Sequence, residues 1–285
     1  TWGHEFTLES RNIVGDFNWK TNLNITIPRN KVVKLSTNNT PIGGDERYAD
    51  WNRLQVGQPI GVFYGYVFDG VYMTQEEFDT QPKHWSSEVG TARMKDVDKN
   101  GYIDENDRTI IGNPNPDVLY GITNEFSWKN FDLSVLISGQ LGGDVFLGSS
   151  DNSFNLDGVF NVDREVKNRW RSLENPGNGK VPRTLTGTTE IFRLKHSGWV
   201  YDASYMTLRN VTLGYTIPFK PNKYISKARI YFSGQQLFTV TGYPGLNPEI
   251  NNNEAGKGLS WSGMGVDMTT YPIPRTFTIG LDITF

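Results

Sequence analysis

The 285-residue sequence contains no cysteine and has little excess charge, with a formal net charge of −3 and an isoelectric point near 5.7. The absence of cysteine excludes disulfide bonds and thiolate chemistry, and it is ordinary for a protein that crosses an oxidising periplasm. There is no basic excess to attract a phosphate backbone. The composition therefore does not favour a nucleic-acid-binding protein.

The chain also lacks any run of about 18 apolar residues, which excludes a transmembrane helix. Its mean hydropathy of −0.49 is typical of a soluble protein. A membrane β-barrel is also hydrophilic on average, because only every second residue of each strand faces lipid. The mean hydropathy therefore does not exclude a membrane β-barrel.

The chain does show strict alternation of apolar and polar residues, most clearly in its last eleven residues, 275–285. Successive side chains of a strand point to opposite faces, so this segment has one apolar and one polar face. Lipid on one side and a polar lumen on the other produce that pattern. The apolar positions are Phe277, Ile279, Leu281, Ile283 and Phe285.

Period-two alternation recurs along the chain and predicts seven long strands. A tilted strand needs about 9 to 11 residues to cross the hydrocarbon, and these segments are long enough. The expected fold is all-β, with polar side chains such as Asn18, Asn22, Asp132, Thr212 and Asp282 facing the interior. The predicted strands are 4–12, 16–28, 118–128, 130–141, 204–217, 227–240 and 275–285.

Short and long connections alternate between these strands. The short ones are 13–16, 128–130 and 218–226, whereas the long ones, 29–117, 142–203 and 241–274, are rich in Gly, Asn, Asp and Pro. An up-and-down outer-membrane barrel has short periplasmic turns and long extracellular loops. We therefore expect the three long segments to be extracellular and the C-terminus to be periplasmic. Seven strands cannot close such a barrel, so we expect this chain to be the C-terminal piece of a larger one.

Several motifs, taken together, resemble the C-terminal region of the SusC/RagA family of TonB-linked outer-membrane transporters. The resemblance covers nearly the whole chain. The motifs are Gly57-Gln-Pro-Ile-Gly61, Phe63-Tyr-Gly-Tyr66, Asp69-Gly70, Asp96-Val-Asp-Lys-Asn-Gly101, Asp107-Arg108, Ile111-Gly112, Tyr120-Gly121, Ser204-Tyr-Met-Thr-Leu-Arg-Asn-Val-Thr-Leu-Gly-Tyr-Thr-Ile-Pro218, Gly234-Gln-Gln-Leu-Phe-Thr239, Gly245, Asn247-Pro-Glu249 and the closing strand.

The resemblance implies a transmembrane antiparallel up-and-down β-barrel of about 22 strands, of which residues 1–285 are the C-terminal seven or so. The plug domain, the N-terminal strands and the segment that engages TonB are expected to lie outside this chain. The implied location is the outer membrane of a Gram-negative bacterium of Bacteroidota type. The implied partners are the rest of the barrel and plug, TonB, membrane lipid and a SusD-like lipoprotein lid. The implied substrate is a glycan fragment or a peptide.

One stretch of the first long segment has the spacing of a calcium loop. Positions 1, 3, 5, 6, 9 and 12 of that loop are Asp96, Asp98, Asn100, Gly101, Asp104 and Asp107, and Tyr102 offers its carbonyl. Ca²⁺ prefers several oxygen ligands, and glycine at position 6 permits the sharp turn around it. The sequence predicts a structural Ca²⁺ here, although Asp replaces the usual bidentate Glu at position 12. The alternative is an Asp/Asn-rich turn held by its own hydrogen bonds.

Aromatic and helical signals in the remaining sequence are less specific. Tryptophans 51, 85, 170, 199 and 261 fall in the long segments, where each either stacks on sugar or packs. Trp19, Trp128, Tyr215 and Tyr224 lie near strand ends and fit an interfacial aromatic girdle. A short helix is expected within 161–173, begun by Asn161 or Asp163, and another after the capping box Thr74-Gln-Glu-Glu77.

No catalytic constellation accompanies these signals. The three histidines, His4, His84 and His196, lie in different segments, and no phosphate-binding loop is present. We predict a protein without enzymatic activity. The alternative to the transporter is a soluble, calcium-stabilised all-β module that binds carbohydrate. That alternative requires the apolar side chains of 275–285 to pack inside a self-contained sandwich.

Overall fold

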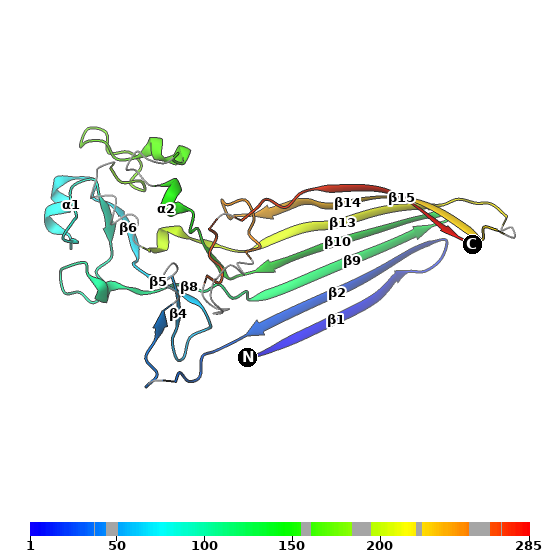
Figure 1. The fold of residues 1–285 in the computed structure, drawn as a ribbon, viewed down its shortest axis with the longest axis horizontal. Helices are drawn as coiled ribbons and strands as arrows, with labels where there is room; N and C mark the ends of the chain where they lie inside the picture. The colour runs from blue at the N-terminus through cyan, green and yellow to red at the C-terminus, as the bar shows by residue number, and fades with distance from the viewer. Residues whose placement is uncertain are drawn as a thin grey trace.

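Seven long strands form one antiparallel sheet that carries a smaller β-rich unit at one end (Figure 1). The computed structural model describes residues 1–36, 38–43, 51–154, 161–183, 195–220, 224–250, 263–268 and 270–285. In the order of the sheet, the strands are β1 (Trp2–Ile13), β2 (Phe17–Arg29), β9 (Val118–Trp128), β10 (Phe131–Leu141), β13 (Tyr205–Thr216), β14 (Lys227–Thr241) and β15 (Thr276–Thr284). Each strand begins and ends within two residues of its predicted bounds.

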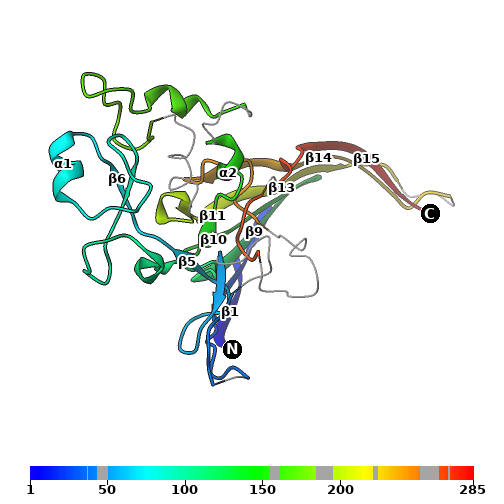
Figure 2. The ribbon, with the colours of Figure 1, turned by 60° about the vertical axis from the view of Figure 1, so that its left-hand side comes forward.

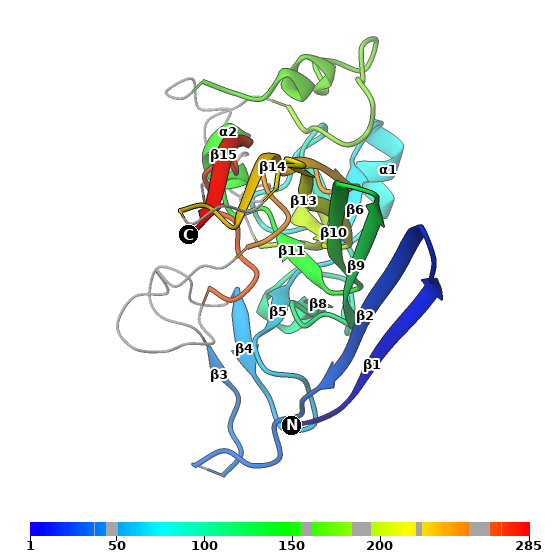
Figure 3. The same ribbon diagram turned by 90° about the vertical axis from the view of Figure 1, so that its right-hand side faces the viewer.

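The sheet is an open arc when viewed along its strands (Figure 3). β1 and β15 form its two edges, and neither pairs with a further described strand. An edge strand leaves a row of backbone N–H and C=O groups without ladder partners. The described residues thus form an open sheet rather than a self-contained sandwich.

The two faces of the sheet differ in polarity, as the alternation predicts. On the apolar face, Phe277, Ile279, Leu281 and Ile283 are 62%, 76%, 58% and 41% exposed. Burying a side chain of this size contributes roughly 1.5–3 kcal/mol of stability. If this face contacted water, the protein would lose that stabilisation at each position. The packing required by the soluble-module alternative is therefore absent from the last strand.

The apolar face contains one polar row near the short turns. The side chains form a continuous chain of hydrogen bonds across three strands: Ser10 Oγ donates to Asn12 Oδ1, Asn12 Nδ2 to Thr21 Oγ1, and Thr21 Oγ1 to Asn124 Oδ1, at 2.7 Å in each case. Trp19 Nε1 also donates to Asn124 Oδ1, at 2.9 Å. Polar groups that partner one another in this way are far less costly to place in an apolar medium.

The long connections fold together into what we call the loop unit, the described residues of 30–117, 142–204 and 242–275. It contains a four-stranded sheet in the order β3-β4-β5-β8 and two two-stranded ladders, β6–β7 and β11–β12. Its elements are β3 (Ile42–Gly43), β4 (Asn52–Leu54), β5 (Val62–Gly65), β6 (Phe68–Val71), α1 (Gln75–Thr80), β7 (Ala92–Met94), η1 (Glu105–Asp107), β8 (Thr109–Gly112), β11 (Asp144–Phe146), α2 (Ser150–Ser153), η2 (Arg164–Asn168), η3 (Ser197–Trp199) and β12 (Val200–Asp202).

The loop unit has its own apolar core. Phe63 and Val266 are fully buried, and Phe146 contacts both the Phe63 ring and the Trp51 ring, with centroids 5.8 and 5.3 Å apart. The core therefore joins all three long segments. None of the buried apolar residues of the described chain lies in the seven long strands. β5 carries Phe63 and β11 carries Phe146, and these two strands lie close together in the ribbon of Figure 2.

Both expected helices are present, and both are short. α1 begins after Thr74, whose Oγ1 accepts from Glu77 N at 3.1 Å, while Glu77 accepts from Met73 N rather than from Thr74 N. The short helix expected within 161–173 is the 3₁₀ helix η2, and Asp163 rather than Asn161 caps it. Among the described residues, no helix has the length and apolar character needed to cross a bilayer.

Candidate functional site

The predicted calcium loop lies between β7 and β8 and is anchored in the loop-unit core. Ile103 is 3% exposed and belongs to that core, while the Asp107 side chain is fully buried at the start of the turn into β8. Asp107 Oδ1 accepts from Val97 N at 2.7 Å, and Oδ2 accepts from Asp104 N at 2.8 Å. Asp107 thus holds the two ends of the loop together.

The turn itself is closed by two more aspartates. Asp96 Oδ2 accepts from Gly101 N at 2.8 Å, and Asp98 Oδ1 accepts from Asn100 N at 3.1 Å. Gly101 has φ 90°, a left-handed conformation that side chains rarely adopt, so glycine is needed at this sixth position. The sequence left two alternatives, a Ca²⁺-binding loop and a turn held by its own hydrogen bonds. Both need the left-handed backbone at Gly101, so this conformation does not distinguish them.

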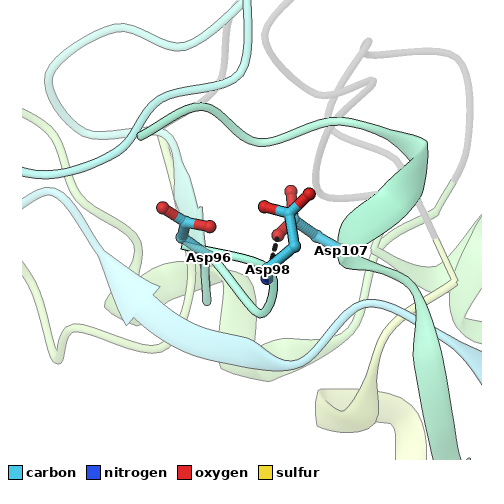
Figure 4. A group of neighbouring side chains, drawn as sticks. All are labelled: Asp96, Asp98 and Asp107. Atoms are coloured by element: carbon cyan, nitrogen blue, oxygen red, sulfur yellow. Dashed lines mark hydrogen bonds between the residues drawn. The ribbon is translucent and has the colours of Figure 1, made fainter. Parts of the chain in front are cut away.

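Three of the predicted ligands converge (Figure 4). One carboxylate oxygen of each of Asp96, Asp98 and Asp107 lies within 4.8 Å of the other two. Asp104 is not part of this converging group, and its Oδ1 accepts from Asn106 N and caps η1. Tyr102 N donates to Asn100 Oδ1 at 2.8 Å, so Asn100 stays within the turn.

The carboxyl groups of Asp96 and Asp98 differ in the direction of their pKa shifts. Desolvation raises the pKa of Asp96, but backbone hydrogen bonds, including that from Gly101, outweigh it and set the pKa below its ordinary value. Desolvation and then the negative charge of Asp107 raise the pKa of Asp98, although Asn100 N donates to it. The neighbouring carboxylates of Asp107 and Asp96 disfavour the charged form of Asp98, and a bound divalent cation relieves repulsion of this kind.

The tryptophans of the loop unit divide into two kinds. Trp51, Trp170 and Trp199 are 7%, 6% and 7% exposed, so each serves packing. Trp85 is 84% exposed and lies beside His84, with ring centroids 5.4 Å apart. Trp261 lies outside the described residues. Of the four aromatics predicted near strand ends, Trp128 and Tyr224 are exposed, whereas Trp19 and Tyr215 are half-buried.

The polar face of the sheet carries an ion network that the sequence did not reveal. Arg229 Nε donates to Asp132 Oδ1 at 2.9 Å and Arg229 Nη1 to Asp282 Oδ2 at 3.1 Å, joining β10, β14 and β15. A Cβ on Gly214 would lie 2.3 Å from Arg229 Nη2. Glycine there allows the guanidinium to cross β13 flat against the sheet. Arg229, Gly214 and Asp132 lie on three different strands, so no local spacing in the sequence indicates their contact.

A cavity of about 470 Å³ also lies against the sheet near the short turns. Its polar lining includes Asn18, Lys20, Glu125 and Asp132, of which Asn18 and Asp132 were predicted to face the interior. Asn18 Nδ2 donates across to Ser127 Oγ at 3.4 Å, and Lys20 Nζ lies 3.8 Å from Glu125 Oε2. The polar face therefore carries charged as well as neutral polar side chains.

Comparison with known proteins identifies this arrangement. No protein-family model matches the chain. TonB-dependent receptor P3 of Formosa agariphila is 35% identical over 303 residues, covering 99% of this chain and 28% of the receptor. TonB-dependent receptor SusC of Bacteroides thetaiotaomicron is 27% identical over 296 residues, covering 100% of this chain and 26% of SusC. The chain is homologous to part of the SusC/RagA-type TonB-dependent receptors.

The solved structures agree on the fold. The RagAB peptide transporter matches with a TM-score of 0.75 at 19% identity, over 99% of this chain and 29% of the transporter chain. The RagAB peptide importer in its open-open state matches with a TM-score of 0.69. The antiparallel sheet thus corresponds to part of a TonB-dependent receptor barrel, and its open edges agree with a barrel fragment.

The homology confirms the coarse expectations from the sequence. The chain spans about 28% of the length of the first curated relative that it matches. Those relatives are receptors and transporters rather than enzymes, in agreement with the predicted lack of enzymatic activity. His4, His84 and His196 lie on separate elements, and His196 is buried, its Nδ1 accepting from Gly198 N at 3.1 Å. The homology also assigns the sheet to the outer membrane of a Gram-negative bacterium.

Proposed function

We propose that this chain forms the C-terminal barrel wall and much of the outer surface of a TonB-dependent importer. The observation that carries the proposal is the exposed apolar face of an open seven-strand sheet whose sequence is 35% identical to a TonB-dependent receptor. Lipid satisfies the apolar face, and the missing strands of a closed barrel satisfy the two edges.

The orientation follows from the connections. The short turns at one end of the sheet are periplasmic, and the loop unit at the other end is extracellular. Because β15 runs toward the short turns, the C-terminus lies on the periplasmic side. The polar face lines the lumen, and its charged side chains contact the plug domain supplied by the rest of the protein.

The cargo in this proposal is a glycan fragment or a peptide delivered by a SusD-like surface lipoprotein. Support comes from the relatives, since one is SusC and others are RagAB peptide transporters. The loop unit offers surface for such a lid, including Trp85, an 84% exposed aromatic of the kind enriched at interfaces. Energy for import comes from the inner membrane through TonB.

The proposal is tested with the full-length protein in cells. Uptake of fluorescent oligosaccharides and peptides is measured with and without TonB, and the lipoprotein is co-purified from detergent extracts. We expect uptake of one class to require both TonB and the intact barrel, and Trp85→Ala to weaken lid association while Trp51→Ala unfolds the loop unit. TonB-independent uptake of every cargo contradicts the proposal.

We also propose that Asp96, Asp98 and Asp107 hold a Ca²⁺ ion that stiffens the loop, with Asn100, Tyr102 and Asp104 completing the ligands. The convergence of three carboxylates on a calcium-type spacing supports it. The test is to measure the melting temperature of the loop unit at increasing Ca²⁺ concentrations. We expect Ca²⁺ to raise that temperature in the natural protein and Asp98→Asn to abolish the rise. Glu76→Gln, on exposed α1, serves as the charge-matched control and should retain it.

A further inference from the structure

A second cavity, of about 290 Å³, lies where the lumen-facing ends of two long strands meet the loop unit. Gln140 of β10 and Tyr205 of β13 pair directly and share the polar face, and they form part of its lining. Asp144 and Glu249 of the loop unit form another part, with prolines 114, 116 and 248 among the apolar walls. A concave site with mostly apolar walls and a few convergent polar groups is the usual form of a ligand site.

An irregular backbone fixes one side of this cavity. Arg209 is an extra residue in β13, where the pairing with both neighbouring strands shifts, and Gln236 opposite has φ 52°. Such bulges redirect side chains and occur next to functional sites. Arg209 Nε donates to Ser138 Oγ at 2.7 Å, and Nη2 donates to Glu249 Oε2 at 2.6 Å. The bulge thereby holds Glu249 against the polar face.

The second carboxylate oxygen of Glu249 is left without a partner. Glu249 Oε1 is buried and has no hydrogen-bond partner among the described residues, although the Tyr205 hydroxyl lies beside the Glu249 carboxylate. A buried acceptor in this state costs about 1–3 kcal/mol, more for a charged group. A ligand that brings an N–H or O–H donor into the cavity removes that cost.

Asp144 adds an uncompensated negative charge. It lies directly opposite Asp202 in the β11–β12 ladder, an arrangement that is destabilising for like charges. Asp144 Oδ2 accepts from Asn113 N at 2.8 Å, and no ion pair to Asp144 occurs within the described residues. Burial, and then the charges of Asp202 and Asp117, raise the pKa of Asp144. The nearby Arg29 and Arg209 are already paired with Asp117 and Glu249.

We propose that this cavity is a subsite for a cationic group of the imported substrate, a primary ammonium or a guanidinium, with Asp144 and Glu249 as its acceptors. The proposal rests on the proposed import function and deepens it by specifying a substrate chemistry. A neutral saccharide also supplies hydroxyl donors, but it brings no charge to offset Asp144. An anionic sugar is repelled by the same carboxylates.

The test is calorimetric titration of the detergent-purified full-length protein with three probes: trilysine, trilysine acetylated on every side chain and at its N-terminus, and maltotriose. Trilysine is expected to bind, and the acetylated peptide and maltotriose at least tenfold more weakly. Asp144→Asn keeps an oxygen for Asn113 N but removes the charge, and should weaken trilysine binding about tenfold, which corresponds to about 1.4 kcal/mol. Glu76→Gln, the same change of charge on α1 at the far end of the loop unit (Figure 1), should leave affinity unchanged.

Three results overturn the subsite: equal affinity for trilysine and its acetylated form, no effect of Asp144→Asn, or no trilysine binding at millimolar concentration. The melting temperature of each variant shows that the loop unit is folded. TonB-dependent uptake of fluorescent cargo is measured on the same variants. If the natural protein shows no preference for trilysine over its acetylated form while TonB-dependent uptake is retained, the subsite alone is rejected, whereas TonB-independent uptake rejects the import function.

Discussion

The seven-strand sheet and the loop unit are built from one chain but place their apolar side chains in opposite ways. The sheet holds Ile279 76% exposed on its outer face, whereas the loop unit buries Phe63 completely. Both have polar backbones satisfied by β-pairing. The difference shows that the sheet is organised for an apolar surrounding and the loop unit for water, so hydrophobic burial stabilises only the latter in the usual sense.

The largest expected effect is the loss of the loop-unit core. Phe63→Ala removes a fully buried ring that contacts Phe146 and should destabilise the loop unit by about 3–5 kcal/mol. Hydrogen exchange should then speed up in β5 and β8 but stay unchanged in β13 and β14. Leu281→Ala on the apolar face is the control. Equal loss of protection in the loop unit and the sheet would contradict their independence.

A charge on the apolar face should have the next largest effect. Ile279→Lys places an ammonium in the hydrocarbon, at about 2–4 kcal/mol near the midplane. Thr278→Lys, one residue earlier, points into the lumen and should be tolerated. Heat-modifiable migration on gels reports the folded fraction of the full barrel. Similar folding defects in the two variants would show that the faces are not distinct.

Two glycines allow the same comparison through the backbone. A Cβ on Gly65 would lie 2.2 Å from the carbonyl oxygen of Lys195, so Gly65→Ala forces backbone movement in the loop unit, at about 1–3 kcal/mol. A Cβ on Gly121 of β9 meets nothing within 4 Å. Gly121→Ala should therefore be neutral. Thermal unfolding in detergent measures both, and a destabilised Gly121→Ala would oppose the lumen-wall assignment.

The sequence could predict the sheet because alternation is local information. The alternation within each strand predicts its apolar and its polar face, as it does from Phe277 to Ile283. The short turns predict which strands are neighbours in the sheet. The loop unit was not predictable as a folded body, because Trp51, Phe146 and Val266 meet only in three dimensions. The same holds for the site. Asp96, Asp98 and Asp107 share one short segment and were found, whereas Gln140, Asp144, Tyr205 and Glu249 have no common spacing.

Asp104 shows a finer limit of sequence analysis. Its position in the calcium pattern predicts a ligand, yet the residue is also an N-cap, and the structure uses it to begin η1. Both roles require a side-chain oxygen at this position, to bind the cation in one case and to accept from a backbone N–H in the other. Residue type and spacing alone do not distinguish them.

The smallest expected effect concerns the polar row on the apolar face. Asn124→Ala removes the acceptor of both Thr21 and Trp19, and should destabilise the barrel by about 1 kcal/mol. Ser10→Ala, at the end of the row, removes one donor and should have less effect. Urea unfolding in lipid vesicles compares the two. A larger loss for Ser10→Ala would mean that the row does not act through Asn124.

The most direct test of the account is the surrounding of β15. Because this chain has no cysteine, single spin labels can be placed by the changes Phe277→Cys, Ile279→Cys and Leu281→Cys on one face, and Thr276→Cys, Thr278→Cys and Asp282→Cys on the other. In reconstituted full-length protein, collision with oxygen reports lipid and collision with a water-soluble nickel chelate reports water. We predict that the first three labels are accessible to oxygen and shielded from nickel, alternating with the second three. Equal access of nickel to both sets would contradict the assignment of the apolar face to the membrane.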